Sequence, residues 1–173
     1  LEGGGASSVM AAILANQKAA HLRDGIPSAE KRIEWIDRCI GLLVDFQDEI
    51  CDAMAEDFGH RSKDQSALTD VAGSIGPLKF AKKNVRKWIR GEKRSVEFPL
   101  GLLGSRAEIQ FQPKGVVGVI SPWNFPVQLT FGPMASILAA GNRVMIKPSE
   151  FTEKTSELMK RMFAQAFDEE EVA

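Results

Sequence analysis

Cysteine and histidine are scarce in this chain, and their scarcity excludes several classes of protein. The 173 residues include two cysteines and two histidines. Cys39 and Cys51 both fall in one predicted helix, about 18 Å apart along its axis, whereas a disulfide needs Cα atoms within roughly 7 Å. His21 and His60 have no partners at metal-ligand spacing, so we predict no metal site. Reduced, buried thiols are typical of cytoplasmic proteins, and we expect that location.

The chain also lacks an excess of charge of one sign and a long apolar run. The chain carries 22 lysines and arginines against 23 acidic residues, which gives no indication of a nucleic-acid partner. No segment approaches the roughly 20 apolar residues of a membrane span, so we expect no membrane contact. Hydrophobic residues make up 44% and charged residues 26%, as in ordinary globular proteins with a buried core.

The N-terminal half of the chain is mainly helical in its pattern. We expect a flexible N-terminus and a first helix over residues 1–27. Apolar residues then recur at three- and four-residue steps, which predicts one helix of about seven turns from Ser28, a good N-cap, to Gly59. A second periodic segment, Leu68–Ile89, contains Gly76–Pro77. We expect a kink or break there, because proline lacks the backbone N–H donor.

Two short segments beyond the helices alternate apolar and polar residues, as half-buried strands do. They are Val96–Phe98 and Ala107–Gln112, and a turn-rich connection, Pro99–Gly104, joins them. We predict an antiparallel pair, which completes an N-terminal region of residues 28–112. An exposed edge pair of this kind is a natural site for contacts between subunits.

The last third of the chain has the pattern of a doubly wound α/β fold. The continuous apolar run Val116–Ile120 is typical of a parallel strand buried on both faces. A helix that ends at Gly141, a strand over Val144–Ile146 and a helix over 152–167 follow it. This strand–helix–strand–helix order predicts that residues 113–173 form the first half of an α/β domain. No turn signal follows the last helix, and we expect the next strand to begin there.

Two loops of this region occupy the place where ligands bind in open α/β sheets, beyond the carboxyl ends of the strands. They are a first loop, Ser121–Pro126, and a second loop, Lys147–Glu150. Asn124 carries an amide N–H that can donate to a developing oxyanion. Lys147 and Glu150 offer a donor and an acceptor, which suit the two hydroxyls of a ribose.

A simpler interpretation of the same residues stays open at this point. Asn124 is then the cap of the next helix, and Lys147 and Glu150 are a solvated pair. The Gly-x-Gly-x-x-Gly dinucleotide fingerprint and the phosphate-binding P-loop are both missing from the sequence.

Two longer motifs closely resemble the aldehyde dehydrogenase superfamily in order and spacing. The first covers residues 113–126 (PKGVVGVISPWNFP) and the second covers residues 138–150 (LAAGNRVMIKPSE). The helices and the segment Thr130–Ala140 are similar to the branch that holds the class 3 and coniferyl aldehyde dehydrogenases. The resemblance covers nearly the whole chain after about residue 20.

The resemblance implies a role for individual residues. Asn124 matches the side-chain oxyanion donor of the family, and Lys147 and Glu150 match the pair that holds the adenosine ribose. The carboxylate of Glu150 repels a 2′-phosphate, which favours NAD, although NADP is accepted by related enzymes with this pair. The implied cofactor-binding positions are Ser121, Pro122, Trp123, Lys147, Pro148, Ser149 and Glu150.

The resemblance also implies that part of the catalytic machinery lies outside this chain. The nucleophilic cysteine and the base glutamate of the family lie beyond the position of Ala173, and Cys39 and Cys51 match neither. We therefore expect an N-terminal fragment that is inactive alone. Its parent is expected to be a homo-oligomer, a dimer or tetramer, that oxidises coniferyl or another aromatic or aliphatic aldehyde through a cysteine thiohemiacetal.

Two other functions remain open on the sequence. Acylating aldehyde dehydrogenases and acyl-phosphate reductases share the architecture, and Trp123 before Asn124 favours the hydrolytic enzymes over them. Retention of the base glutamate in the rest of the protein would support hydrolysis. A non-catalytic association module is the third hypothesis, and it requires that the gene stop near Ala173.

Overall fold

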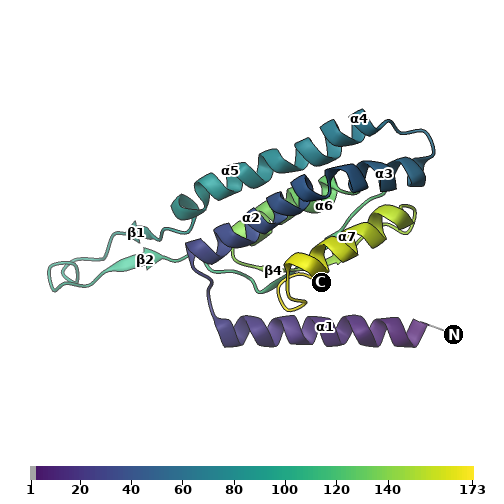
Figure 1. The fold of residues 1–173 in the computed structure, drawn as a ribbon. Helices are drawn as coiled ribbons and strands as arrows, with labels where there is room; N and C mark the ends of the chain where they lie inside the picture. Colours follow the sequence, from purple (N-terminus) through teal and green to yellow (C-terminus); the bar gives the residue numbers. More distant parts are fainter. Residues whose placement is uncertain (1–2) are drawn as a thin grey trace.

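Helices make up most of the chain and enclose a small parallel sheet (Figure 1). The computed structural model describes residues 3–173, with side chains from Ser7 onward. The elements in chain order are α1 (Gly3–Asp24), α2 (Ala29–Asp45), α3 (Gln47–Phe58), α4 (Lys63–Ser66), the π-helical turn η1 (Ala67–Ala72), α5 (Gly73–Trp88), β1 (Glu92–Arg94), β2 (Ala107–Ile109), β3 (Val116–Ile120), α6 (Gln128–Ala139), β4 (Arg143–Lys147) and α7 (Glu153–Ala166). The predicted α/β class is confirmed.

The N-terminal segment is helical almost from its start. Helix α1 begins at Gly3, inside the glycine-rich stretch, and the first two residues of the predicted flexible start lie outside the described residues. Gln17 on α1 is buried, and its side-chain amide donates to the carbonyl of Val144 at 2.9 Å. Helix α1 therefore packs against the parallel sheet. None of the helices within residues 3–173 is long and apolar enough to cross a membrane.

The long helix predicted between Ser28 and Gly59 is two helices, so that prediction is wrong in one respect. Ser28 caps the first one as expected, and its side chain accepts from the Lys31 amide. The helix is interrupted at Phe46, whose φ of −105° and ψ of 15° leave the helical region. The interruption lets α2 pack on α5 and α6 while α3 packs on α7. A pattern of apolar residues cannot reveal that two halves face different partners.

Proline 77 does not break its helix, so of the predicted kink or break the break is wrong. Helix α5 runs from Gly73 through Pro77 to Trp88. The irregularity lies one turn earlier, in η1, which has the wider π-helical hydrogen bonding. Pro77 is the fifth residue of α5 and lacks the N–H that would bond to the Gly73 carbonyl, yet the helix continues through it.

The predicted antiparallel pair is present, but its first strand begins earlier in the sequence than expected, closer to the end of α5. Strand β1 pairs with β2 in the register Glu92↔Ile109 to Arg94↔Ala107, and the predicted strand Val96–Phe98 lies in the connection instead. Every residue of both strands is exposed, so burial does not impose an alternating pattern on the sequence. Figure 1 shows the hairpin extending away from the helices.

The parallel sheet forms as the sequence predicts. Strands β3 and β4 pair in parallel from Val116↔Arg143 to Ile120↔Lys147, and α6 connects them. The turn after α6 needs Gly141, whose φ is +84°. Of the five residues of β3, only Val119 is buried within residues 3–173, so a strand with the pattern of burial on both faces is incompletely covered in this stretch of chain. Within residues 3–173, β3 has a strand partner on one side alone.

A further strand begins after the last helix, as expected. Val172 forms a parallel bridge with Val144 of β4, on the side opposite to β3. The sequence showed no turn signal before it, yet the amides of Glu171 and Val172 both donate to the Asp168 carbonyl in a tight turn. Trp35 of α2 holds this turn, because its indole N–H donates to the Glu171 carboxylate at 2.8 Å.

Candidate functional site

The two predicted loops lie side by side at the carboxyl edge of the sheet. The first loop follows β3 and the second follows β4, and the two strands are direct neighbours. The Ser121 amide donates to the Lys147 carbonyl at 3.0 Å, so the ladder continues to the point where both loops begin. This is the place where open parallel sheets bind ligands.

The first loop is tied to the helix that follows it. The Ser121 hydroxyl is buried and shares a hydrogen bond of 2.7 Å with the Thr130 hydroxyl of α6. Thr130 also donates to the carbonyl of Pro126 at 2.6 Å. One threonine thus holds both ends of the loop, and the Ser121 side chain serves this internal contact.

Asn124 lies at the exposed middle of the first loop. Its backbone carbonyl accepts from the Arg61 guanidinium at 2.8 Å. Within the described chain, its side-chain amide makes no hydrogen bond and is available to a ligand. The first amide of α6, that of Gln128, is bound by the Asp70 carboxylate at 3.2 Å. The alternative interpretation of Asn124 as the helix cap is therefore wrong.

Trp123 forms an apolar surface beside Asn124. Its side chain is about half exposed, at 54%. The indole contacts the ring of Phe58, with ring centroids 6.5 Å apart, and Pro122 next to it is exposed. Because proline limits the backbone and the aromatic pair limits the indole, the loop offers a stiff, flat surface to a ligand.

The second loop presents an exposed donor and acceptor. The Lys147 ammonium lies 2.6 Å from the Glu150 carboxylate, and both side chains are largely exposed. The hydrogen bond from Lys147 holds the pKa of Glu150 below its usual range, so the carboxylate is ionised at neutral pH. Ser149 between them is buried, and its hydroxyl oxygen accepts from the Phe151 amide at 3.2 Å.

The donor set of this loop fits the ribose of a nucleotide cofactor. A diol needs a carboxylate as acceptor and a cation or amide as donor, and Glu150 and Lys147 supply these. A solvated surface pair has the same appearance, so the assignment of these two residues to a ribose stays a prediction. Pro148 between them is partly buried and shapes the loop.

Neither cysteine has the properties of a nucleophile. Cys39 on α2 and Cys51 on α3 are both buried and free. Burial raises the pKa of the Cys39 thiol. Burial also raises the pKa of Cys51, and the nearby carboxylates of Asp48 and Asp52 add to the effect. A nucleophilic thiol needs the opposite shift, and these two are packing residues.

Several residues that support the site were not found from the sequence. Arg61 follows α3 and binds the first loop, and Asp70 in η1 binds the start of α6. Asp57 at the end of α3 binds the amide of Thr155, just after the second loop. Each of them meets its partner across more than fifty residues, so a search of local motifs cannot reveal them.

Fold and site together define an α/β protein with two adjacent polar loops at the carboxyl edge of its parallel sheet, and comparison with known proteins specifies the family. The family model described as "Aldehyde dehydrogenase family" matches residues 2–172. The chain therefore belongs to the aldehyde dehydrogenase family, a family of enzymes.

Relatives agree with this assignment. The chain is 64% identical over 167 residues to the protein named "Probable coniferyl aldehyde dehydrogenase" in Caulobacter vibrioides, which covers 96% of this chain and 34% of the relative. It is 48% identical over 159 residues to the coniferyl aldehyde dehydrogenase of a Pseudomonas species, covering 92% and 32%. The chain thus spans about a third of the length of these relatives.

Solved structures show the same fold. The substrate-bound state of Staphylococcus aureus AldH matches with a TM-score of 0.84 and 27% identity, covering 94% of this chain and 35% of that one. An NAD-dependent benzaldehyde dehydrogenase from Corynebacterium glutamicum matches with a TM-score of 0.76 and 27% identity, covering 92% and 34%.

Proposed function

We propose that the full-length protein containing this chain oxidises an aldehyde to the carboxylic acid, with a nicotinamide cofactor as the oxidant and water as the source of the second oxygen. The single observation that carries the proposal is the exposed amide of Asn124, which makes no hydrogen bond to any described residue. It lies in a loop anchored at both ends, next to the loop that carries the Lys147–Glu150 pair. The nucleophilic cysteine and the base come from the rest of the protein. The 173 residues alone have no dehydrogenase activity in this proposal.

Asn124 supplies the oxyanion donor in this proposal. When a thiolate adds to the aldehyde carbon, negative charge develops on the carbonyl oxygen. An amide N–H aimed at that oxygen stabilises the charged state more than the neutral aldehyde, which lowers the barrier. Because Thr130 holds both ends of the loop, the backbone that carries the amide need not be ordered at the moment of reaction.

Lys147 and Glu150 hold the ribose of the cofactor, whose nicotinamide accepts a hydride when bound. The Glu150 carboxylate accepts from the ribose hydroxyls, and the Lys147 ammonium donates to one of them. A 2′-phosphate brings two negative charges next to Glu150, so NAD is preferred over NADP. Trp123 and Pro122 border the nicotinamide end, and Pro148 and Ser149 shape the second loop.

Coniferyl aldehyde is the substrate that we propose to test first. Support comes from the two relatives named as coniferyl aldehyde dehydrogenases, at 64% and 48% identity. We further propose that the protein is a cytoplasmic homo-oligomer with subunit contacts at the β1–β2 hairpin. Large apolar side chains exposed there support this, namely Phe98, Leu102 and Leu103.

Substitution of Asn124 tests the proposal. In the full-length protein, Asn124→Ala should lower kcat for coniferyl aldehyde with NAD about 100- to 1,000-fold, the usual cost of one oxyanion donor. The measurement is steady-state NADH formation, with the acid identified as the product by chromatography. The Michaelis constant for NAD should stay within about twofold, because Asn124 does not hold the ribose.

The control for this test is Asn84→Ala. The side chain of Asn84, on α5, donates to the Phe80 carbonyl of its own helix, far along the chain from both loops. This variant should keep full activity. Wild-type turnover in Asn124→Ala would overturn the assignment, and an acyl thioester or acyl phosphate as the product would favour the acylating relatives.

A further inference from the structure

A buried ion pair lies directly behind the first loop. The Arg61 guanidinium, in the connection after α3, binds the Asp70 carboxylate of η1 with Nη2 and Oδ2 2.6 Å apart. The two side chains are 7% and 0% exposed. Removal of two charges from water is costly unless their other hydrogen-bonding atoms are also used. The partners of those atoms therefore indicate what the pair does.

Nη1 of Arg61 and Oδ1 of Asp70 both bind the segment Asn124–Gln128, whereas Nε of Arg61 is buried without a hydrogen-bond partner in the described residues. Nη1 of Arg61 donates to the Asn124 carbonyl at 2.8 Å. Oδ1 of Asp70 accepts from the Gln128 amide at 3.2 Å. One ion pair thus holds the first residue of this segment and the residue that starts α6. The Asn124 backbone is thus hydrogen-bonded to a residue, Arg61, that lies 63 residues earlier in the chain.

The guanidinium itself has little freedom to move. The rings of Phe58 and Phe125 each lie 5.0 Å from its central carbon. Nη2 also donates to the Thr69 hydroxyl at 3.1 Å. Arg61 contacts two rings through its planar group and binds different partners through two nitrogens. The single ammonium of lysine cannot fill this role.

We propose that Arg61 is the positioning residue of the oxyanion donor. Its guanidinium holds the Asn124 carbonyl and thereby sets the orientation of the loop from which the Asn124 amide reaches the substrate. The proposal rests on the proposed role of Asn124. An error of about 1 Å in such a group costs up to about 100-fold in rate, so Arg61 influences kcat without contact to the aldehyde or the cofactor.

A double-mutant cycle in the full-length protein tests this role. Arg61→Lys keeps a charge next to Asp70 and releases the Asn124 carbonyl. We expect kcat to fall 10- to 100-fold in the wild-type background, while the Michaelis constant for NAD changes less than twofold. In the Asn124→Ala background, Arg61→Lys should change kcat less than threefold, since the group that it positions is already absent. An arginine that only stabilises the fold would lower kcat equally in both backgrounds.

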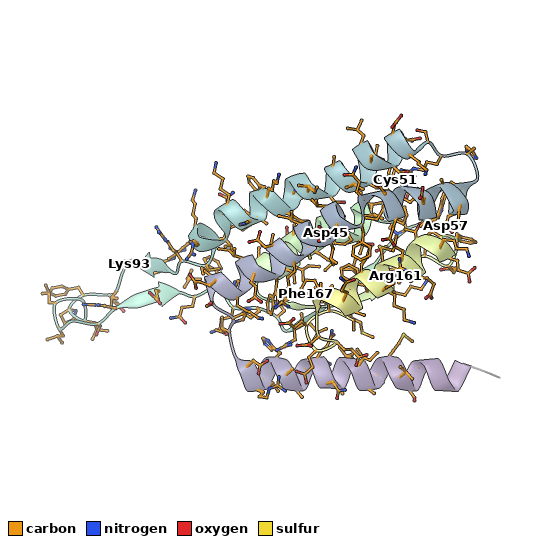
Figure 2. All side chains as sticks on the ribbon, viewed as in Figure 1. Asp45, Cys51, Asp57, Lys93, Arg161 and Phe167 are labelled. Atoms are coloured by element: carbon orange, nitrogen blue, oxygen red, sulfur yellow. The ribbon has the colours of Figure 1, made fainter. Side chains whose placement is uncertain are left out.

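A second variant covers the case in which Arg61→Lys fails to fold, as judged by its thermal unfolding. Thr69→Val removes only the hydroxyl beside the guanidinium, and a smaller loss of kcat with the same dependence on Asn124 is expected. The control, Arg161→Lys, changes an exposed arginine of α7 (Figure 2) and should leave kcat unaltered.

The outcomes separate the two proposals. Equal losses in both backgrounds, or no loss from Arg61→Lys or Thr69→Val, would overturn the positioning role. Full activity of Asn124→Ala would instead overturn the proposed function of Asn124, whatever the Arg61 variants do.

Discussion

At the scale of single residues, the second loop presents a charge that should select between cofactors. Glu150 is exposed, and Lys147 is its partner in the ion pair. Its pKa lies below the usual range because of the hydrogen bond from Lys147, so the charge is present throughout neutral pH and is lost only in acid, as pH falls through that lowered value. A carboxylate at this place repels a ligand with an added phosphate more than one without it.

We predict that Glu150→Gln in the full-length protein reduces the preference for NAD over NADP about five- to tenfold, measured as the ratio of the two kcat/KM values. The effect is modest because water and salt screen an exposed charge. The change in the ratio should come mainly from a higher kcat/KM for NADP.

Glu157→Gln provides the control, since it removes the same charge from the exposed face of α7. It should leave the cofactor ratio unchanged. An unchanged ratio in Glu150→Gln as well would show that Glu150 does not face the adenosine ribose.

At the scale of elements, one helix caps another. Thr152 is the N-cap residue of α7, but it makes no side-chain capping bond. Asp57 at the end of α3 takes its place, since its carboxylate accepts from the Lys154 and Thr155 amides at 2.9 and 2.8 Å. Figure 2 shows Asp57 beside α7. A carboxylate at a helix N-terminus also interacts favourably with the positive end of the helix dipole. Helix α3 therefore stabilises α7, the helix that follows the second loop.

We predict that Asp57→Ala destabilises α7 by about 1 kcal/mol, because two amides lose their partner. Hydrogen exchange of the peptide that covers the first turn of α7 should then be about fivefold faster. Asp57→Asn should fall between the wild type and Asp57→Ala, because its amide oxygen can still accept.

The comparison variant is Asp45→Ala, at the exposed end of α2 (Figure 2). It should change stability by less than about 0.5 kcal/mol, as most surface substitutions do. Equal exchange rates in Asp57→Ala and Asp45→Ala would contradict the capping role.

At the scale of the whole molecule, the hairpin of β1 and β2 stands apart from the rest. Figure 1 shows it extending beyond the helices. Its connection exposes Phe98, Leu102 and Leu103 at 81%, 80% and 78%. Neighbouring apolar side chains that remain exposed on a folded chain are typical of an interface with another chain.

We predict that the double substitution Leu102→Glu and Leu103→Glu converts the proposed full-length homo-oligomer to a smaller species, because buried like charges oppose association. Sedimentation velocity measures the mass. Leu68→Glu, which changes an exposed leucine of η1 in the same way, should keep the wild-type mass. A wild-type mass in the hairpin variant would show that the subunit contact lies elsewhere.

Much of the candidate site follows from local sequence. The end of β3, the turn at Gly141 and the start of α7 lie within two residues of where apolar runs, a glycine and a helix pattern place them. Since parallel neighbouring strands end at one edge, the meeting of the first and second loops also follows. The positions of Arg61 and Asp57 do not, because neither residue differs in its local pattern from an ordinary charged surface residue.

The sequence by itself therefore determined the class of fold, the strand–helix–strand–helix order of the last third of the chain and the family, since these depend on local periodicity and on two contiguous motifs. Only the tertiary structure decided where α2 ends, which helix caps α7, and what holds Asn124 in place. Those features come from contacts between distant segments, such as Arg61 with Asn124 and Trp35 with Glu171. Their free energy exists only after the chain has brought both partners together, so no local pattern of residues records it.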